Sequence, residues 1–296
     1  MSYQIFTDSS CDLTSELRKE FNIDYFRMVF TVDGNDYPAD LDFKLYSKEQ
    51  LYEWIRDPKV DIHTSLIGMN EFLTRLTPYL EKGIDILYIG CTSVLSGSLN
   101  FFRLAAEELK EKYPERKLIS VDSCRAGMTL GIMVMDAAKM QKEGKTMEEI
   151  VSYVEENKQK YNLCGTVPTL TYLRQAGRVS GAAAFFANSL NIKPLIVADT
   201  KGHNYTLKKI RGWKTVLEAL FDLVKDTVEG IEKPLIYIGQ GAAQETSDYF
   251  KKRFIEELHA EVVEYWVGPI IGISCGPGVI HLVCKGKEVT ITAPEK

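Results

Sequence analysis

The sequence predicts an α/β protein of two domains, a parallel-sheet domain over residues 1–160 and an α+β domain with a mixed or antiparallel sheet over residues 161–296. The first observation is the length of 296 residues, which exceeds what one hydrophobic core comfortably serves. The second is that strand and helix patterns alternate in the first half, which favours parallel pairing. The third is that hairpin patterns mix with helices after about residue 160, which favours antiparallel pairing.

Residues 84–109 contain the clearest unit of the first half. An apolar run at 84–89 is typical of a strand buried on both faces, and apolar residues recur at helical spacing over 101–109. Between them lies a loop rich in glycine and hydroxyl side chains, residues 90–98. The free amides at a helix N-terminus attract anions, so this loop suits an anion site. The alternative is that Ser96 or Ser98 only caps the helix.

The remaining elements of the first half follow from periodicity and from turn residues. We expect Asp12 to cap a helix over 13–21, and Thr146 with Glu149 to form a capping box. Further strands are expected at 3–7, 25–32 and 117–121, and further helices at 51–55, around 72–80, at 127–142 and at 146–160.

Three predicted strand ends in this half carry polar residues. They are the segments 8–10 (DSS), 92–93 (TS) and 122–123 (DS). Ligands of an open α/β sheet bind beyond the carboxyl ends of its strands, so these loops favour an anion site there. Asp8 and Asp122 themselves are interpreted as turn or helix caps.

The second half reads as an α+β arrangement. Residues 201–204 (KGHN) predict the turn of a hairpin between strands at 194–198 and 205–210. Other strands are expected at 163–167, 235–238, 262–267 and 279–284, with helices at 170–176, 181–190, 213–228 and 244–259.

Composition excludes several classes of function. The net charge of −5, without a basic stretch, argues against nucleic-acid and membrane-surface partners. No apolar run approaches the ~20 residues that span a bilayer, and no signal peptide precedes the first strand, so we expect a cytoplasmic protein without stable membrane insertion. Six scattered cysteines and four histidines give no support to a metal site.

The motifs of common enzymes are weak or missing. G-x-x-x-x-G-K-[ST] and G-x-S-x-G do not occur, so an autonomous kinase and a serine hydrolase are disfavoured. Residues 239–244 (GQGAAQ) follow a predicted strand and open a helix, as a dinucleotide-binding loop does, but Gln244 replaces the last small residue. A nucleotide-dependent enzyme using Gly239–Gln244 is therefore the alternative function.

Six segments, in this order, resemble the DegV family of fatty-acid-binding proteins. They are TDSSCDL (7–13), TS (64–65), TSVLSGS (92–98), VDS (121–123), YLRQAGRVSG (172–181) and GPIIGISCGPG (268–278). The resemblance spans nearly the whole chain, and it implies a Rossmann-like N-terminal domain and a C-terminal α+β domain that hold one long-chain fatty acid between them.

The resemblance also implies roles for particular residues. Thr64, Ser93 and Ser96 would hold the carboxylate, with Ser65 and Gly97 adjacent, and Arg178 would be the family's arginine at the mouth of the site. Arginine beside small residues suits a carboxylate or phosphate, although it also commonly decorates a surface. Such a protein is not itself an enzyme. It is at most the lipid-binding subunit of a bacterial fatty acid kinase, it needs no cofactor, and a separate dihydroxyacetone-kinase-type partner makes the acyl phosphate.

The chain departs from the family pattern at three places. Ser274, at the mouth, stands where many members have histidine, His281 stands where a small residue is usual, and TSLIG (64–68) replaces TSQPS. These departures put phosphoryl transfer and partner docking in question. For the acyl tail we expect small and aromatic side chains of 181–190, with ordinary core packing as the alternative. The candidates are Ala183, Phe185, Phe186, Ala187 and Leu190.

Overall fold

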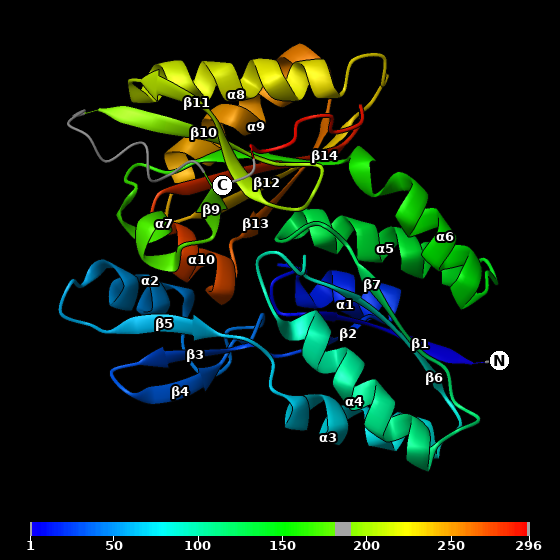
Figure 1. Ribbon diagram of the computed structural model, residues 1–296. Coiled ribbons are helices and arrows are strands. Elements are labelled where there is room, and N and C mark those ends of the chain that lie inside the picture. The colour runs from blue at the N-terminus through cyan, green and yellow to red at the C-terminus, as the bar shows by residue number, and fades with distance from the viewer. Residues whose placement is uncertain (1, 181–190, 295–296) are drawn as a thin grey trace.

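The computed structural model describes residues 2–180 and 191–294, and these form three sheets flanked by helices (Figure 1). The first is a four-stranded sheet in the order β2-β1-β6-β7, in which every neighbouring pair is parallel. Its strands are β1 (Tyr3–Asp8), β2 (Asp24–Phe26), β6 (Asp85–Gly90) and β7 (Leu118–Asp122). Both faces are covered by helices, which explains why β6 is a continuous buried run.

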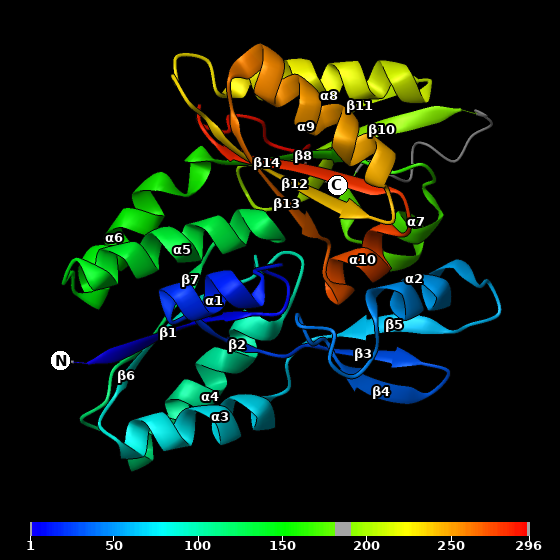
Figure 2. The same cartoon turned by 180° about the vertical axis from the view of Figure 1, so that it is seen from behind.

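Helices α3 (Met69–Glu81) and α4 (Ser98–Lys112) cover one face of this sheet. On the other face lie α1 (Ser15–Phe21) and α5 (Met128–Lys142), and α6 (Met147–Asn157) packs beside α5 before a short 3₁₀ turn, Lys158–Lys160. Helix α5 contacts strands of two sheets, β1 and β6 on one side and β8 and β14 on the other (Figures 1 and 2). A helix between two layers must be apolar around most of its circumference, and α5 is.

A small antiparallel sheet, β4-β3-β5, lies beside helix α2 (Lys48–Arg56). Its strands are β3 (Val29–Val32), β4 (Asn35–Pro38) and β5 (Ile62–Ser65). The single strand expected over 25–32 is wrong, because the chain leaves the first sheet after Phe26 and enters this one at Val29. The break is fixed by Ser9, whose hydroxyl accepts a hydrogen bond from the Met28 amide at 2.9 Å.

The third sheet has seven strands in the order β13-β12-β14-β8-β10-β11-β9. The β12–β13 and β11–β9 pairs are parallel and the other four are antiparallel. The predicted hairpin is confirmed as β10–β11. The strands are β8 (Tyr161–Thr166), β9 (Val179–Ser180), β10 (Ile192–Ala198), β11 (Asn204–Arg211), β12 (Leu235–Gly241), β13 (Glu261–Trp266) and β14 (Val279–Lys285).

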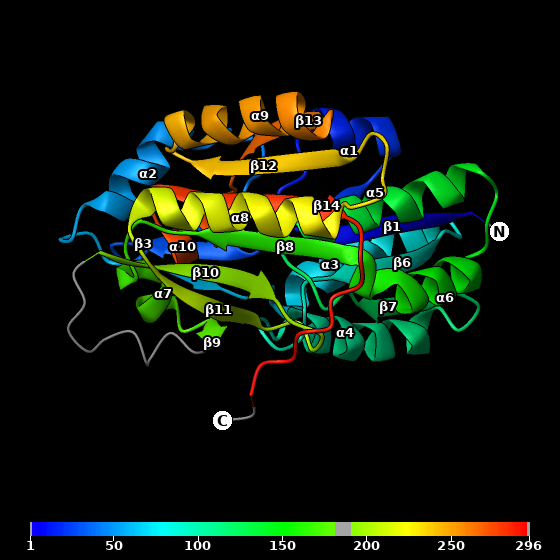
Figure 3. The same cartoon turned by 90° about the horizontal axis from the view of Figure 1, so that it is seen from above.

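Helices α8 (Trp213–Thr227) and α9 (Gln244–Leu258) lie along the outer face of the seven-stranded sheet (Figure 3). Its inner face meets α5 and the short helices α7 (Thr171–Ala176) and α10 (Pro269–Cys275). The predicted fold class is therefore confirmed: a parallel sheet in the N-terminal half and a mixed sheet in the C-terminal half. The division into two domains at residue 160 stays a prediction.

Local capping was predicted with mixed success. Thr146 and Glu149 form the expected capping box of α6. Asp12 does not cap α1, whose N-cap is Thr14. Instead, an Asp12 carboxylate oxygen accepts a hydrogen bond from the Gly268 amide at 3.0 Å, at the start of α10. Asp12 thus joins the two halves of the molecule.

Arg125, in the loop after β7, is a second link between the halves. It is buried, and its guanidinium donates to the carbonyls of Tyr161 (2.7 Å) and Asp199 (3.1 Å) and to the side-chain oxygen of Gln159 (2.9 Å). Burial lowers its pKa to about 10. Its guanidinium also donates to the Cys124 carbonyl at 2.7 Å, so its charge is held by neutral oxygens from both halves of the chain.

Candidate functional site

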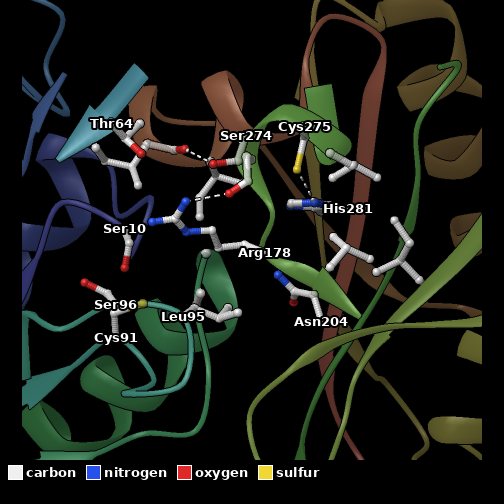
Figure 4. A pocket seen from close by; sticks show the side chains of 18 of the residues that line it. Ser10, Thr64, Cys91, Leu95, Ser96, Arg178, Asn204, Ser274, Cys275 and His281 are labelled. Carbon is white, nitrogen blue, oxygen red and sulfur yellow. Dashed lines mark hydrogen bonds between the residues drawn. The ribbon is translucent and has the colours of Figure 1, made fainter. Parts of the chain in front are cut away.

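A cavity of about 390 Å³ lies between the N-terminal half and the inner face of the seven-stranded sheet (Figure 4). This volume is within the range of small-molecule sites, roughly 300–1,000 Å³. We call it the central cavity. Ser10, Thr64 and Ser96 lie on one side of it and His281 on the other, with Arg178 between them. Its two sides differ in the chemistry of the side chains that line them.

The side formed by the N-terminal half carries hydroxyl groups among apolar side chains, which are Met28, Leu66, Leu95 and Ala126. Ser10 follows β1, Thr64 and Ser65 end β5, and Ser96 precedes α4. A short hydrogen-bond chain draws these segments together: the Ser96 and Ser98 hydroxyls are 2.9 Å apart, and the Ser98 hydroxyl accepts from the Ile67 amide at 3.1 Å. The N-terminus of α4 therefore lies beside the hydroxyl groups and favours an anion there.

Two aspartates support this side of the cavity without lining it. Asp8 is fully buried and accepts hydrogen bonds from the Ser10 hydroxyl (2.6 Å) and the Cys91 amide (2.8 Å). Asp122 accepts from the Cys124 amide at 3.0 Å. Both therefore act within turns, as the sequence predicted, and Asp8 fixes where Ser10 points.

Arg178 is exposed and extends into the central cavity from the loop after α7. Its Nη1 donates to the Ala176 carbonyl at 2.5 Å, which leaves further donors of the guanidinium available. Among the described residues that line the cavity there is no aspartate or glutamate. An anionic group entering the cavity would therefore meet a cation and several hydroxyl groups, and no like charge.

The opposite side of the cavity is mostly apolar. Its aliphatic lining residues come from β8, α7, β9, β10 and α10, so that five separate elements build one surface. They are Leu163, Val167, Leu173, Val179, Ile196, Ile270 and Ile271. Such a surface suits a hydrocarbon, since removing apolar area from water drives binding.

His281 and Cys275 interrupt this apolar surface. The His281 Nε2 atom lies 3.9 Å from the Cys275 sulfur. Burial lowers the pKa of His281 to about 4 and, with a contribution from Asp12, raises the pKa of Cys275 to about 12. At neutral pH both groups are uncharged, so the pair does not provide an activated thiolate or a charged acid–base couple.

The structure brings most of the predicted site residues together. Six line the central cavity: Thr64, Ser65, Ser96, Gly97, Arg178 and Ser274. Ser93 does not, because its side chain is exposed and only its amide is held, by Asp122 at 3.3 Å. Its role in holding a carboxylate stays a prediction that this geometry does not support. The tail candidates Ala183, Phe185, Phe186, Ala187 and Leu190 lie outside the described residues.

Sequence reasoning did not assign six further polar lining residues: Ser10, Cys91, Thr166, Asn204, Cys275 and His281. Ser10 could have been found, since it stands in one of the three polar loops at strand ends. Asn204 begins β11, and nothing in the local sequence shows that this end of the strand faces the other half of the molecule.

The Gly239–Gln244 loop does not contribute to the central cavity. Its glycines are explained by packing: a Cβ atom at Gly239 would collide with the Tyr265 ring, and one at Gly241 with the Tyr52 hydroxyl. The Ala243 amide is bonded to the Gln240 side chain at 2.8 Å. Close approach of two tyrosines therefore accounts for a glycine pattern that resembled a nucleotide site.

Residues 2–285 match the DegV family, which is described as a family of uncharacterised proteins. The chain belongs to the DegV family. A DegV domain-containing protein of Clostridium perfringens is 32% identical over 285 residues, which cover 96% of this chain and 97% of that protein. The resemblance seen in the six sequence segments is thereby confirmed.

Solved structures of other proteins share the fold. A fatty-acid-binding DegV family protein from Thermus thermophilus matches with a TM-score of 0.86 at 23% identity, and 97% of this chain and 100% of that one are covered. A stearic acid-binding protein from Eubacterium ventriosum matches with a TM-score of 0.86 at 22% identity, over 96% and 98% of the two chains. At these identities the likeness shows the fold alone.

Two findings concern other classes of site. None of the helices in the described part of the chain combines the length and the apolar character that crossing a membrane requires. The same residues hold no group of three or more metal-ligating side chains. The predicted cytoplasmic location stays a prediction.

Proposed function

We propose that this DegV family member binds one long-chain fatty acid in the central cavity. The observation that carries the proposal is that one cavity has hydroxyl groups on one side, mostly apolar side chains on the other and the cation Arg178 between them. A fatty acid has the matching two-part chemistry. Two solved structures of the same fold are of proteins described as binding fatty acids, which supports the proposal.

The carboxylate end is assigned to Thr64, Ser65 and Ser96, with Arg178 and Ser274 at the mouth. Hydroxyl groups donate to a carboxylate, and hydrogen bonds to a charged group contribute about 1.5–3 kcal/mol each. The N-terminus of α4 adds a favourable potential for an anion. These contacts fix which end of the ligand faces the N-terminal half.

The acyl tail is assigned to the aliphatic surface beneath the seven-stranded sheet. Burial of ~15 methylene groups at ~0.8 kcal/mol each gives roughly 12 kcal/mol before losses. Lost ligand freedom and imperfect desolvation offset much of that gain. Tail burial therefore supplies most of the affinity, and the hydroxyl groups supply the orientation.

Native mass spectrometry of freshly purified protein tests this proposal. We expect an adduct with the mass of a fatty acid, lost on delipidation and restored by adding free fatty acid. A dinucleotide adduct would instead support an enzyme that uses Gly239–Gln244. Protein that takes up neither a retained nor an added fatty acid would contradict the proposal.

We further propose that the protein presents its fatty acid to a separate kinase as the non-catalytic subunit of a fatty acid kinase. The support is the exposed position of Arg178, whose guanidinium suits both a carboxylate and the acyl phosphate formed from it. The test is ATP-dependent acyl-phosphate formation when a dihydroxyacetone-kinase-type protein is added to the loaded protein. Absence of product with every such partner from the same genome would contradict this role.

A further inference from the structure

Gly127, on the wall of the central cavity, lies between two buried polar atoms from opposite halves of the chain. A Cβ atom at Gly127 would stand 3.7 Å from the Asp12 Oδ2 atom and 4.0 Å from the His281 Nδ1 atom. Because residue 127 is a glycine, with φ of +64°, it places no side chain between these two atoms. We call this place the Gly127 niche.

Both atoms of the niche lack a hydrogen-bond partner within the described chain, and they do not bond to each other. The other oxygen of Asp12 accepts from the Gly268 amide at 3.0 Å, so the carboxyl group is anchored with Oδ2 left over. The other nitrogen of His281 has only the Cys275 sulfur at 3.9 Å. Buried polar atoms are costly to leave unpaired, so two of them flanking one point on a cavity wall indicate a ligand group.

The protonation states of Asp12 and His281 indicate which chemical group of a ligand would pair with them. Burial raises the pKa of Asp12 well above its ordinary value, and the Gly268 amide offsets this only in part. Burial lowers the pKa of His281 to about 4, so its imidazole is neutral at pH 7. The raised pKa favours the neutral form of Asp12, whose O–H is a donor, and His281 offers a neutral ring nitrogen. A hydroxyl group, which accepts one hydrogen bond and donates another, complements the pair.

We propose that the Gly127 niche binds a hydroxyl group carried part-way along the acyl chain, so that the central cavity selects hydroxylated fatty acids over unsubstituted ones. This inference rests on the proposed function, because it takes the acyl chain to run from the hydroxyl side to the aliphatic side. His281 lies on that aliphatic side (Figure 4), whereas the Gly127 amide donates to the Ser10 carbonyl at 2.7 Å, so the niche lies where the aliphatic side meets the hydroxyl side. A site built to bond a hydroxyl rejects the analogue that lacks it, since its polar atoms then stay unpaired.

A water molecule carries the same O–H chemistry, and a positional series separates the two sources. Delipidated protein is titrated with stearic acid and with hydroxystearic acids whose hydroxyl moves along the chain from carbon 2 to carbon 16. We expect at least about tenfold tighter binding for one mid-chain position, with the gain lost two or three carbons to either side. Equal affinity at every position would mean that the niche holds water or nothing, and would overturn the proposal.

Variants connect the preference to the niche. His281→Leu should reduce the preference to within about twofold, by weakening binding of the hydroxy acid and by strengthening binding of stearic acid. His259→Asn is the control, because His259 is exposed at the C-cap of α9 and does not line the central cavity. Its backbone is left-handed, which asparagine tolerates. The control should keep the full preference. A preference that survives in folded His281→Leu, as judged by thermal unfolding, would overturn the proposal.

Asp12→Asn tests the neutral donor. The asparagine oxygen still accepts from the Gly268 amide, and its N–H₂ group replaces the acid O–H, so we expect the preference to persist within a few fold. Complete loss would show that Asp12 acts as an anion and would overturn the assignment. Failure of the proposed function is distinct from all these results, because the protein would then bind stearic acid and hydroxystearic acids equally poorly.

Discussion

The two faces of the seven-stranded sheet use alternate residues of the same strands for different purposes. On β14, Ile280, Leu282 and Cys284 point to the core under α8 and α9, whereas Val279 and Val283 belong to the core shared with the N-terminal half. The face under the helices contains closely packed aromatic rings, with Phe250 and Phe254 stacked 5.6 Å apart. The inner face holds the central cavity and the niche of unpaired polar atoms.

This difference teaches how one sheet combines stability with binding. Apolar packing that leaves no gap contributes most where nothing has to enter, which is the face under α8 and α9. A cavity with buried polar groups lowers stability, and the inner face tolerates it because the other face and α5 hold the sheet in place. The predictions below test whether the two faces are as separable as this comparison implies.

The largest effect is expected from a matched pair of leucine substitutions. Leu282→Ala, under the helices, should lower the free energy of unfolding by about 3–5 kcal/mol and leave fatty-acid affinity of the folded protein within about twofold. Leu173→Ala, which borders the existing cavity, should cost about 2 kcal/mol but weaken binding several fold. Urea unfolding and fluorescent fatty-acid titration measure both quantities. Similar binding losses in the two variants would break the comparison.

The next effect concerns pH and belongs to the inner face alone. The pKa of His281 is about 4 in the folded protein, below its ordinary value of 6.5, so the unfolded chain binds more protons between these pH values. The contribution of His281 to the free energy of unfolding is therefore fully present above pH 6.5. It falls by up to about 3 kcal/mol as the pH drops toward 4. His281→Leu should flatten that part of the stability–pH curve. An unchanged curve in His281→Leu would contradict the assignment of His281 as neutral.

Asp12 contributes the opposite slope to the stability–pH curve, because its raised pKa makes the folded protein less stable as pH rises above about 4.

Hydroxyl substitutions on the cavity's polar side should affect binding rather than stability. Thr64→Val and Ser96→Ala would each remove one of the proposed hydrogen bonds to the carboxylate, and we expect a ten- to hundredfold loss of fatty-acid affinity. Ser93→Ala is the matched control, since Ser93 is exposed outside the cavity. If Ser93→Ala is as harmful as Ser96→Ala, the sequence-based assignment is right and the cavity does not mark the carboxylate site.

The smallest effect on binding is expected at Arg178. Arg178→Ala should change fatty-acid affinity only a few fold, because in the proposed site the hydroxyl groups and the N-terminus of α4 satisfy the carboxylate without it. The same variant should impair acyl-phosphate formation with a partner kinase, and Arg178→Lys should restore little, because a point charge does not reproduce the planar fork. Wild-type turnover by both variants would reduce Arg178 to a surface charge.

Local sequence patterns predicted most elements and half of the site, for identifiable reasons. The loop before α4 was found because strand ends and hydroxyl-rich loops are local signals, whereas the Thr64–Ser65 pair was assigned through the family resemblance. The role of Asp12 was missed because its partner, Gly268, is 256 residues away, and no local pattern reports such a contact. Strand β14 was predicted, and with it the alternation that places His281 on the opposite face from Ile280. Which of these faces borders a cavity depends on distant segments and was therefore not predicted.

The glycine loop at 239–244 shows the converse limit. Its spacing resembled a dinucleotide site because glycine reports only that something approaches the backbone closely. What approaches here is the ring of Tyr265 and the hydroxyl of Tyr52. A pattern of small residues therefore identifies crowding, and only the three-dimensional neighbours say whether a phosphate or a side chain causes it.

Arg125 has a consequence for how the chain acquires its structure. A cation is costly to remove from water, and this one is compensated by the carbonyl of its neighbour Cys124 and by oxygens of Gln159, Tyr161 and Asp199, which follow it in the sequence. A chain that ends at residue 160 lacks two of these acceptors, so its Arg125 would have to remain hydrated and the loop after β7 could not close as it does here. We therefore expect the halves to unfold in one cooperative transition, and an N-terminal fragment to be a poor substitute for the corresponding part of the intact chain.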